Sequence, residues 1–160
     1  MEYNEKEIRR QDRLLDEAMA RELLKNGEYG VLSMVDGDEA YAVPVNYVWD
    51  GGEAIYIHCA PEGRKLRCIG ANPRVSFCVV GATQVMSALF TTAYQSIVLS
   101  CRAVGRLETE ERRHALNLIL RKYSPADMTI GEKYAEKSFH RTEIIRLDVE
   151  TWSGKAKTVK

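Results

Sequence analysis

The sequence predicts a mainly β protein, a small barrel of about six mostly antiparallel strands with helices at its periphery. Two observations favour this class. Short runs rich in β-branched and aromatic residues are separated by tight-turn sequences, Asp36-Gly37-Asp38 and Asp50-Gly51-Gly52. The chain also lacks the regular alternation of strands and helices that is typical of a parallel sheet. Its 160 residues fit one domain.

The first half of the chain predicts three strands and two helices. The strands are expected at residues 29–35, 40–48 and 54–59, and the helices at residues 16–26 and 62–69. Asp16 is a good N-cap for the first helix, and Gly27 and Gly70 are good stops for the two helices. The short turns between the strands predict an antiparallel meander. Pro44 removes one ladder donor from the second strand, which indicates an edge or an irregular position.

The second half predicts three more strands and two more helices. The strands are expected at residues 74–80, 94–107 and 141–150, and the helices at residues 109–123 and 130–137. In the long strand, apolar residues such as Leu99 and Cys101 alternate with polar ones, which predicts one buried and one polar face. We expect a single domain over residues 1–160, with loosely held polar tails at 1–11 and 156–160.

Composition excludes several classes of protein. The 23 basic and 23 acidic residues give a formal net charge of zero, which argues against a general nucleic-acid binder. The first thirteen residues are too charged for a secretory signal, so we expect a cytoplasmic protein. Residues 75–101 carry no charge, but their glutamines and β-branched residues favour two strands over a membrane span. Neither end carries a lipidation motif.

Standard metal and nucleotide motifs are absent from the sequence. The four cysteines, at positions 59, 68, 78 and 101, match no zinc spacing. We expect Cys78 and Cys101 to fill strands as small hydrophobic residues. The chain has no GxGxxG, Walker A, HExxH or GxSxG motif. We therefore expect no metal site, and no dinucleotide site of the Rossmann type.

The neutral total charge hides a strong segregation. Seven acidic and no basic residues lie between Asn26 and Gly63, and four basic and no acidic residues lie between Arg64 and Arg74. A Pro/Gly turn precedes Arg64 and Lys65 at the expected start of a short helix, where backbone N–H groups favour an anion. Arginine and lysine side chains would add contacts to a phosphate. The pattern is consistent with a phosphate cradle, and equally with a solvated basic helix.

Several segments together resemble the flavin-binding split barrels related to pyridoxamine 5′-phosphate oxidase. They are Tyr29-Gly30-Val31-Leu32-Ser33, Tyr41-Ala42-Val43-Pro44-Val45-Asn46-Tyr47, residues 55–65, Asn72-Pro73-Arg74-Val75-Ser76-Phe77, Tyr94-Gln95-Ser96-Ile97-Val98 and Trp152-Ser153-Gly154-Lys155. The resemblance covers residues 12–155. The stretch His58-Cys59-Ala60 before Gly63-Arg64-Lys65 is most similar to the 5-nitroimidazole antibiotic resistance proteins of that group. The implied fold is a six-stranded antiparallel split β-barrel.

The resemblance implies a cofactor, a partner and a set of site residues. The cofactor is a flavin, FMN with FAD as the alternative, at the interface of a homodimer. Its phosphate would lie on Arg64 and Lys65. The implied contacts to the rest of the flavin are Val43, Pro44, Val45 and Asn46, then His58 and Cys59, and, from the partner subunit, Gln95, Ser96 and Trp152. His58 is the implied catalytic residue, because an imidazole can donate a proton to a group that is being reduced. The competing role for His58 is a local hydrogen bond that shapes the turn.

Three functions remain open at this stage. The first is a flavin-dependent oxidoreductase that reduces nitroimidazoles, nitroaromatics or similar small electrophiles. The second is a flavin- or haem-binding module without turnover, since related split barrels bind haem and a histidine is a suitable axial ligand. The third is a structural dimer without a cofactor. No membrane or nucleic-acid partner is expected for any of them.

Overall fold

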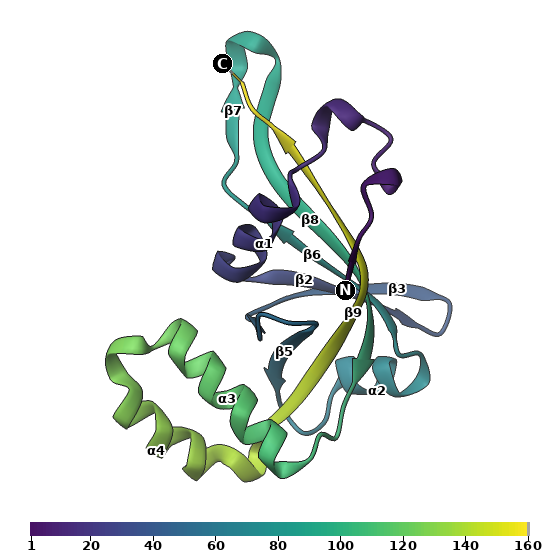
Figure 1. The fold of residues 1–160 in the computed structure, drawn as a ribbon. Coiled ribbons are helices and arrows are strands. Elements are labelled where there is room, and N and C mark those ends of the chain that lie inside the picture. The colour runs from purple at the N-terminus through teal and green to yellow at the C-terminus, as the bar shows by residue number, and fades with distance from the viewer. Residues whose placement is uncertain (160) are drawn as a thin grey trace.

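A strongly twisted, mainly antiparallel sheet with strand order β3-β2-β6-β8-β9-β5-β4 forms the body of the protein in the computed structural model, which describes residues 1–159 (Figure 1). The strands are β1 (Glu2–Tyr3), β2 (Gly30–Asp36), β3 (Glu39–Val45), β4 (Val48–Trp49), β5 (Ala54–Cys59), β6 (Arg74–Val80), β7 (Gln84–Met86), β8 (Thr91–Val104) and β9 (Glu143–Lys157). The helices are α1 (Glu17–Asn26), α2 (Arg64–Ala71), α3 (Thr109–Tyr123) and α4 (Met128–Ser138). The sheet curves without closing, because β3 and β4 end the path. This is the predicted class, an antiparallel split barrel with peripheral helices.

Local sequence signals explain most of the elements. Asp16 caps α1 through its side-chain oxygen, which accepts hydrogen bonds from the backbone N–H groups of Ala18 (2.9 Å) and Met19 (3.3 Å). Gly27 ends the helix as expected. The uncharged run 75–101 forms β6, β7 and most of β8. Among residues 1–159, no helix is both long and apolar enough to cross a membrane.

The expected three-stranded meander is wrong in its third strand. β2 and β3 form a hairpin around Gly37, whose φ of 63° suits glycine. β5, however, pairs with β9 and β4 rather than with β3. The reason lies between β3 and β4, where Tyr47 is fully buried, packs edge-on against Phe77 at 5.0 Å and donates a hydrogen bond to the Leu24 carbonyl (2.6 Å). The chain therefore crosses the core instead of turning back along β3. As a result β3 is an end strand, as Pro44 indicated.

Parts of both expected tails are paired in strands. β1 pairs in parallel with Thr151 and Trp152 of β9, and the Tyr3 ring packs edge-on against the Trp152 ring at 4.8 Å. At the other end, β9 continues to Lys157, seven residues beyond the predicted strand. The sequence does not reveal β1, because a single apolar ring among polar residues shows no strand-like alternation of apolar and polar residues. Lys160 lies outside the described residues.

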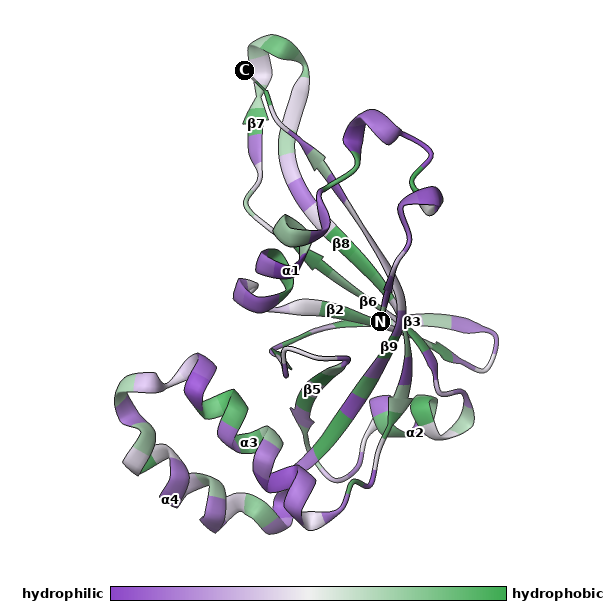
Figure 2. Ribbon diagram, in the orientation of Figure 1, coloured by the Kyte–Doolittle hydropathy of each residue, from purple (hydrophilic) through white to green (hydrophobic). Residues whose placement is uncertain are grey.

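The main core is one cluster of buried side chains from the sheet, α1 and α2. Figure 2 shows hydrophobic residues along the central strands and hydrophilic ones over much of the N-terminal segment and α3. The largest fully buried side chains are Trp152, Tyr47, Phe77, Leu15, Leu24, Leu32, Ile55, Ile57, Ile97, Leu99, Ile144 and Ile145. Cys101 is buried as predicted, whereas Cys78 is only half-buried.

A separate helical hairpin, α3 and α4, stands to one side of the sheet (Figure 1). It is attached through a second apolar cluster, formed by Val48, Ala54, Tyr56, Ala115 and Ile144. Polar bonds surround this cluster. Arg146 of β9 pairs with Glu111 of α3 (2.7 Å) and with Asp148 (2.7 Å), and the Tyr56 hydroxyl donates to Glu111 (3.1 Å).

Candidate functional site

The end strand β3 carries the segment that the sequence assigned to the flavin ring. Val43 and Val45 point toward the core and are half-buried, while Pro44 and Asn46 are exposed. The Asn46 side-chain amide donates to the Glu28 carbonyl at 3.0 Å, which holds the chain just after the strand. No other described strand pairs with the outer edge of β3. Backbone groups at this edge are therefore free to bind a planar heterocycle.

The start of α2 lies directly beside β3. The Arg64 guanidinium donates from Nε to Asp36 Oδ2 (2.6 Å), pairs with Glu39 (3.4 Å), and lies 4.2 Å from the centre of the Tyr41 ring. The hydrogen bond to Asp36 raises the pKa of Arg64 above its ordinary value. The acidic hairpin turn and the basic helix start, separate in the sequence, thus form one ion-paired unit. This pairing joins one base of the basic stretch to two acids of the acidic stretch.

Lys65 and Gly63 are the groups at this helix start that are left open for a ligand. Lys65 is half-buried and makes no ion pair with any described residue. Gly63 has a φ of 143°, and a Cβ placed on it would meet nothing within 4 Å. An anion at the helix start would find backbone N–H groups, a lysine ammonium and no steric obstacle. Arg64 mainly links α2 to the β2–β3 hairpin. Its Nε and Nη2 atoms bind the two carboxylates, and its Nη1 atom binds neither of them.

His58 and Cys59 lie at the end of β5, just before the turn into α2. They pair with Ile144 and Glu143 of β9. His58 is exposed and Cys59 half-buried. Partial loss of hydration, and secondly the positive charge of Lys65, lower the pKa of His58 below 6.5. Burial raises the pKa of the Cys59 thiol. Near pH 7 the site therefore presents a neutral imidazole and a protonated thiol.

Gln95 and Ser96 lie far from this group within one chain. They pair with Ala156 and Lys155 of β9, whereas His58 pairs with Ile144 near the other end of the same strand. Ala156 lies twelve positions beyond Ile144 in β9, a path of about 40 Å in an extended strand. One copy of the chain therefore does not bring the two groups together.

Trp152, which the resemblance implied as a flavin contact from the partner subunit, is buried within its own chain. Its side chain is only 1% exposed and is covered by Tyr3 and by the Arg21 guanidinium, which lies 5.5 Å from the ring centre. Its indole nitrogen has no hydrogen-bond partner among the described residues. Trp152 is thus a core residue in this structure, and no ligand reaches it without displacing the N-terminal segment.

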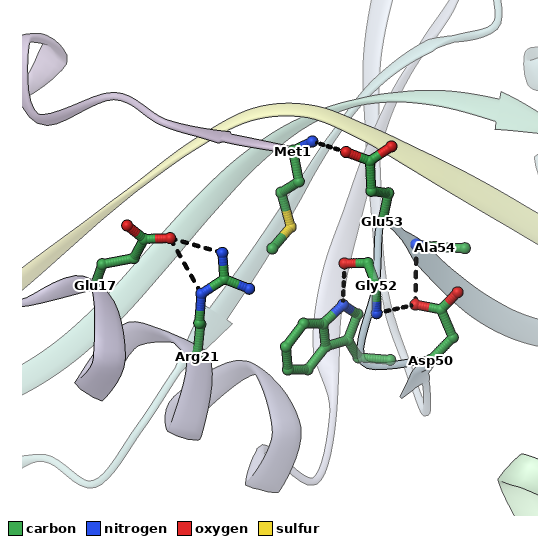
Figure 3. Close-up of polar contacts among 8 residues, drawn as sticks. Met1, Glu17, Arg21, Asp50, Gly52, Glu53 and Ala54 are labelled. Carbon is green, nitrogen blue, oxygen red and sulfur yellow. Dashed lines mark hydrogen bonds and ion pairs between the residues drawn. The ribbon is translucent and has the colours of Figure 1, made fainter.

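Several polar contacts around Arg21 help to cover Trp152 (Figure 3). Glu17 holds Arg21 at 2.7 Å, so that its guanidinium lies near the rings of both Trp49 and Trp152. The Trp49 indole donates to the Gly52 carbonyl at 3.0 Å, and the Met1 amine pairs with Glu53 in the same turn. These contacts fasten the N-terminal segment to the β4–β5 turn.

Sequence reasoning missed a support behind the β3 segment. Lys122 at the end of α3 donates to the Tyr47 carbonyl (2.9 Å) and lies 3.9 Å from the centre of the Tyr47 ring. The Tyr123 hydroxyl lies 2.7 Å from the Glu28 carbonyl and 2.8 Å from that of Tyr47. Burial lowers the pKa of Lys122 to about 8. Nothing local in the sequence indicates that α3 ends against this loop, because the contact spans about half of the chain.

Within residues 1–159, no group of three or more His, Cys, Asp or Glu side chains is arranged to hold a metal ion. The candidate site consists of the edge of β3, the end of β5 and the start of α2, and Arg64 links the last of these to Tyr41 of β3. It offers backbone polar groups, a neutral imidazole and an unpaired ammonium. This set of groups suits an anionic ligand with a flat polar ring.

Comparison with known proteins gives one family and a consistent fold. The sequence model of the family described as pyridoxamine 5′-phosphate oxidase matches residues 16–156. A search of curated proteins found no significant match. A protein from Bacteroides thetaiotaomicron assigned as a 5-nitroimidazole antibiotic resistance protein has a similar structure, with a TM-score of 0.75 and 19% identity over 89% of this chain and 85% of that one.

Two further structures are similar over most of their length. A FAD-binding protein from Mesorhizobium loti has a TM-score of 0.65 and 20% identity, over 91% of this chain and 98% of that one. The FAD and haem binding protein from Mycobacterium smegmatis has a TM-score of 0.69 and 18% identity, over 90% of this chain and 72% of that one. At these identities the likenesses show a shared fold.

Proposed function

This chain belongs to the pyridoxamine 5′-phosphate oxidase family, and we propose that it is a flavin-binding oxidoreductase that reduces nitroimidazoles, nitroaromatics or similar small electrophiles. The observation that carries the proposal is the contact between the start of α2 and β3 through Arg64. This contact links the start of α2, where a phosphate would bind, to β3, where a flat ring would bind. The named relatives that bind FAD, and the relative assigned to nitroimidazole resistance, support this choice of ligand and substrate.

The residues present fit a flavin. The phosphate would lie on the backbone N–H groups after Gly63, with Lys65 and the free Nη1 of Arg64 as charged donors. The ring would lie along residues 43–46, where the unpaired strand edge offers backbone hydrogen bonds. FMN would end at the phosphate position. FAD is the alternative, because its adenosine half would extend over the open surface beyond the helix start.

His58 is the proposed catalytic residue, and Cys59 lines the same turn. A bound reduced flavin supplies two electrons to an electrophile, and each such reduction also consumes protons. The neutral imidazole of His58 would hold the reacting oxygen by its N–H group and pass a proton to it from solvent. Because the side chain is exposed, it can exchange that proton with water between turnovers.

We propose that the active form is a homodimer, with Gln95 and Ser96 of a second copy completing each flavin site. The outer face of the sheet supports this. Its neighbouring side chains Pro44, Val31, Cys78 and Val98 form a row across four strands, and all of them are neutral. Val98 is 47% exposed. A neutral face with exposed apolar side chains is typical of a surface that a second copy covers.

The spectrum of the purified protein, with mass analysis of any released cofactor, tests the proposal. We expect flavin absorbance and a melting temperature that rises with added FMN. A colourless protein that no flavin stabilises would show that the proposed function is wrong.

Two variants separate the parts of the proposed site. Lys65→Met should weaken FMN binding about tenfold or more, whereas Arg67→Met, two residues further along the same helix, should leave it unchanged. His58→Ala should keep the flavin and lose most nitroreductase turnover. Full turnover in this variant would remove His58 from the mechanism.

A second function, a flavin- or haem-binding module without turnover, is favoured by one observation. His58 is an exposed imidazole at the end of a strand, and the similar protein from Mycobacterium smegmatis binds both FAD and haem. Haem reconstitution distinguishes the two functions. A Soret band that is lost in His58→Ala, together with no nitroreductase activity, would replace the oxidoreductase proposal by the module.

A further inference from the structure

A cleft of about 570 Å³ lies between α2 and the end of β8, next to the proposed flavin site but lined by other residues. Its lining residues are Pro61, Leu66, Ile69, Gly70, Ala103, Val104, Gly105, Arg106 and Glu143. None of these belongs to the residues assigned above to the flavin. The volume falls within the range of small-molecule pockets. The face of α2 that carries Leu66 and Ile69 therefore lines a second, separate cavity.

The cleft has an apolar part beside its polar groups. Ile69 and Ala103 are buried, and Leu66 and Val104 are half-buried at its walls. The two glycines keep it open. A Cβ on Gly70 would meet nothing within 4 Å, and a Cβ on Gly105 would meet only the Leu66 methyl at 3.7 Å. Such a cavity favours the hydrocarbon part of a ligand.

The rim carries one cation without a partner. Arg106 is exposed and makes no hydrogen bond or ion pair with any other described residue. Its backbone has a φ of 55°, a left-handed conformation that favours glycine or asparagine. The chain thus holds a long basic side chain over the cleft at a position where the backbone disfavours it.

The one acidic residue at the cleft is already engaged. Glu143 pairs with Arg112 at 3.4 Å, and its carboxylate accepts a hydrogen bond from the Ile144 backbone N–H at 2.9 Å. Its side chain is 16% exposed. Arg106 is therefore the charged group of the cleft that is free to bind a ligand.

We propose that this cleft binds a small monocarboxylate with an apolar chain, its carboxylate on Arg106 and its hydrocarbon between α2 and β8. A single free cation suits a single negative charge, and a dianion would leave one charge facing the carboxylate of Glu143. The proposal does not depend on the flavin, because the cleft and the flavin site use different residues.

Titration of the purified protein with hexanoate, followed by amide NMR and calorimetry, tests the proposal. We expect shifts at Gly70, Gly105 and Arg106, and no binding of hexylamine. From butyrate to hexanoate, each added methylene should strengthen binding about fourfold while the chain still fits the cleft. The shifts should be the same with saturating FMN. Stronger binding of hexylamine, or no shifts at the cleft, would overturn the proposal.

Matched variants test the two halves of the cleft. Arg106→Asn suits the local backbone and should weaken hexanoate binding about tenfold or more, whereas Arg102→Asn, four residues earlier on β8, should change it less than twofold. Gly105→Val should fill the cleft and abolish binding with little change in stability. Unchanged binding in Arg106→Asn or in Gly105→Val would assign hexanoate to another site.

Discussion

The two ends of the long β8–β9 ribbon differ in how completely the chain covers them. At the α2 end, β6 and β5 flank the ribbon, and Cys101, Ala103, Ile145 and Leu147 are buried. At the other end the ribbon continues into an arm formed by β7, the turn after it and the first residues of β8 (Figure 1). On this arm Phe90 is 97% exposed. Both ends are rich in apolar residues, so position in the sheet decides which are buried.

The residues at the covered end stabilise the single chain, whereas those on the arm are left exposed for contact with another molecule. The covered end contains the core and the ion pairs of Arg146. The arm leaves Val85 and Leu89 exposed together with Phe90, and the neutral outer face continues from it. The comparison teaches that apolar content alone does not locate the core of this protein.

The largest expected effect contrasts two phenylalanines. Phe77→Ala removes a fully buried ring that packs against Tyr47, and should lower the free energy of unfolding by about 3–5 kcal/mol. Phe90→Ala at the arm should change it by less than about 0.5 kcal/mol. Urea denaturation of both variants at a concentration where the protein is monomeric measures this. Equal losses would show that the arm folds back into the core.

The next effect concerns the ion pairs at the covered end. Arg146→Met leaves Glu111 and Asp148 without their shared partner and should lower stability by about 1–3 kcal/mol. Arg113→Met breaks an exposed pair with Glu136 on the helical hairpin, and its denaturation curve should overlap that of the parent protein. If the two variants behave alike, the network around Arg146 does not attach α3 to the sheet.

A charge introduced on the neutral outer face of the sheet tests whether a second copy covers that face. Val98→Lys should weaken the proposed dimer about tenfold or more, because the new ammonium would be buried between the copies. Ile130→Lys, at an exposed apolar site on α4 (71% against 47% for Val98), is the control and should leave association unchanged. Sedimentation of the two variants measures this. A dimer that tolerates Val98→Lys would move the interface away from this face.

The smallest effect is the titration of His58. Partial burial and Lys65 hold its pKa below 6.5, so folding favours the neutral imidazole. This contribution to stability is therefore present above pH 6.5 and is lost as the pH falls below that value. NMR titration should give a midpoint below 6.5, and Lys65→Met should raise it. An unchanged midpoint in Lys65→Met would show that the charge of Lys65 does not act on His58.

The sequence predicts what local chemistry decides. Asp16 and Gly27 mark the ends of α1, and the pattern around Leu99 and Cys101 indicates the buried face of β8. The pairing of β5 with β9 was not predictable from the turns, because a turn does not specify which strand lies next to it. β1 was missed because Tyr3 has no apolar neighbours to form a pattern.

The candidate site shows the same limit. The basic helix start was visible in the sequence, but the bond from Arg64 to Asp36 was not, since it depends on how α2 packs against the hairpin. Lys65 then becomes the more available charge. The burial of Trp152 likewise depends on β1, which the sequence did not indicate.

The place of β9 in the sheet has a consequence for synthesis. β9 lies between β8 and β5 and also holds β1, yet it is translated after all three. Until it emerges from the ribosome, β1 has no strand partner and β5 can pair only with the two residues of β4. The edges of β5 and β8 that β9 later covers stay open. The nascent chain therefore needs protection from aggregation until late in translation.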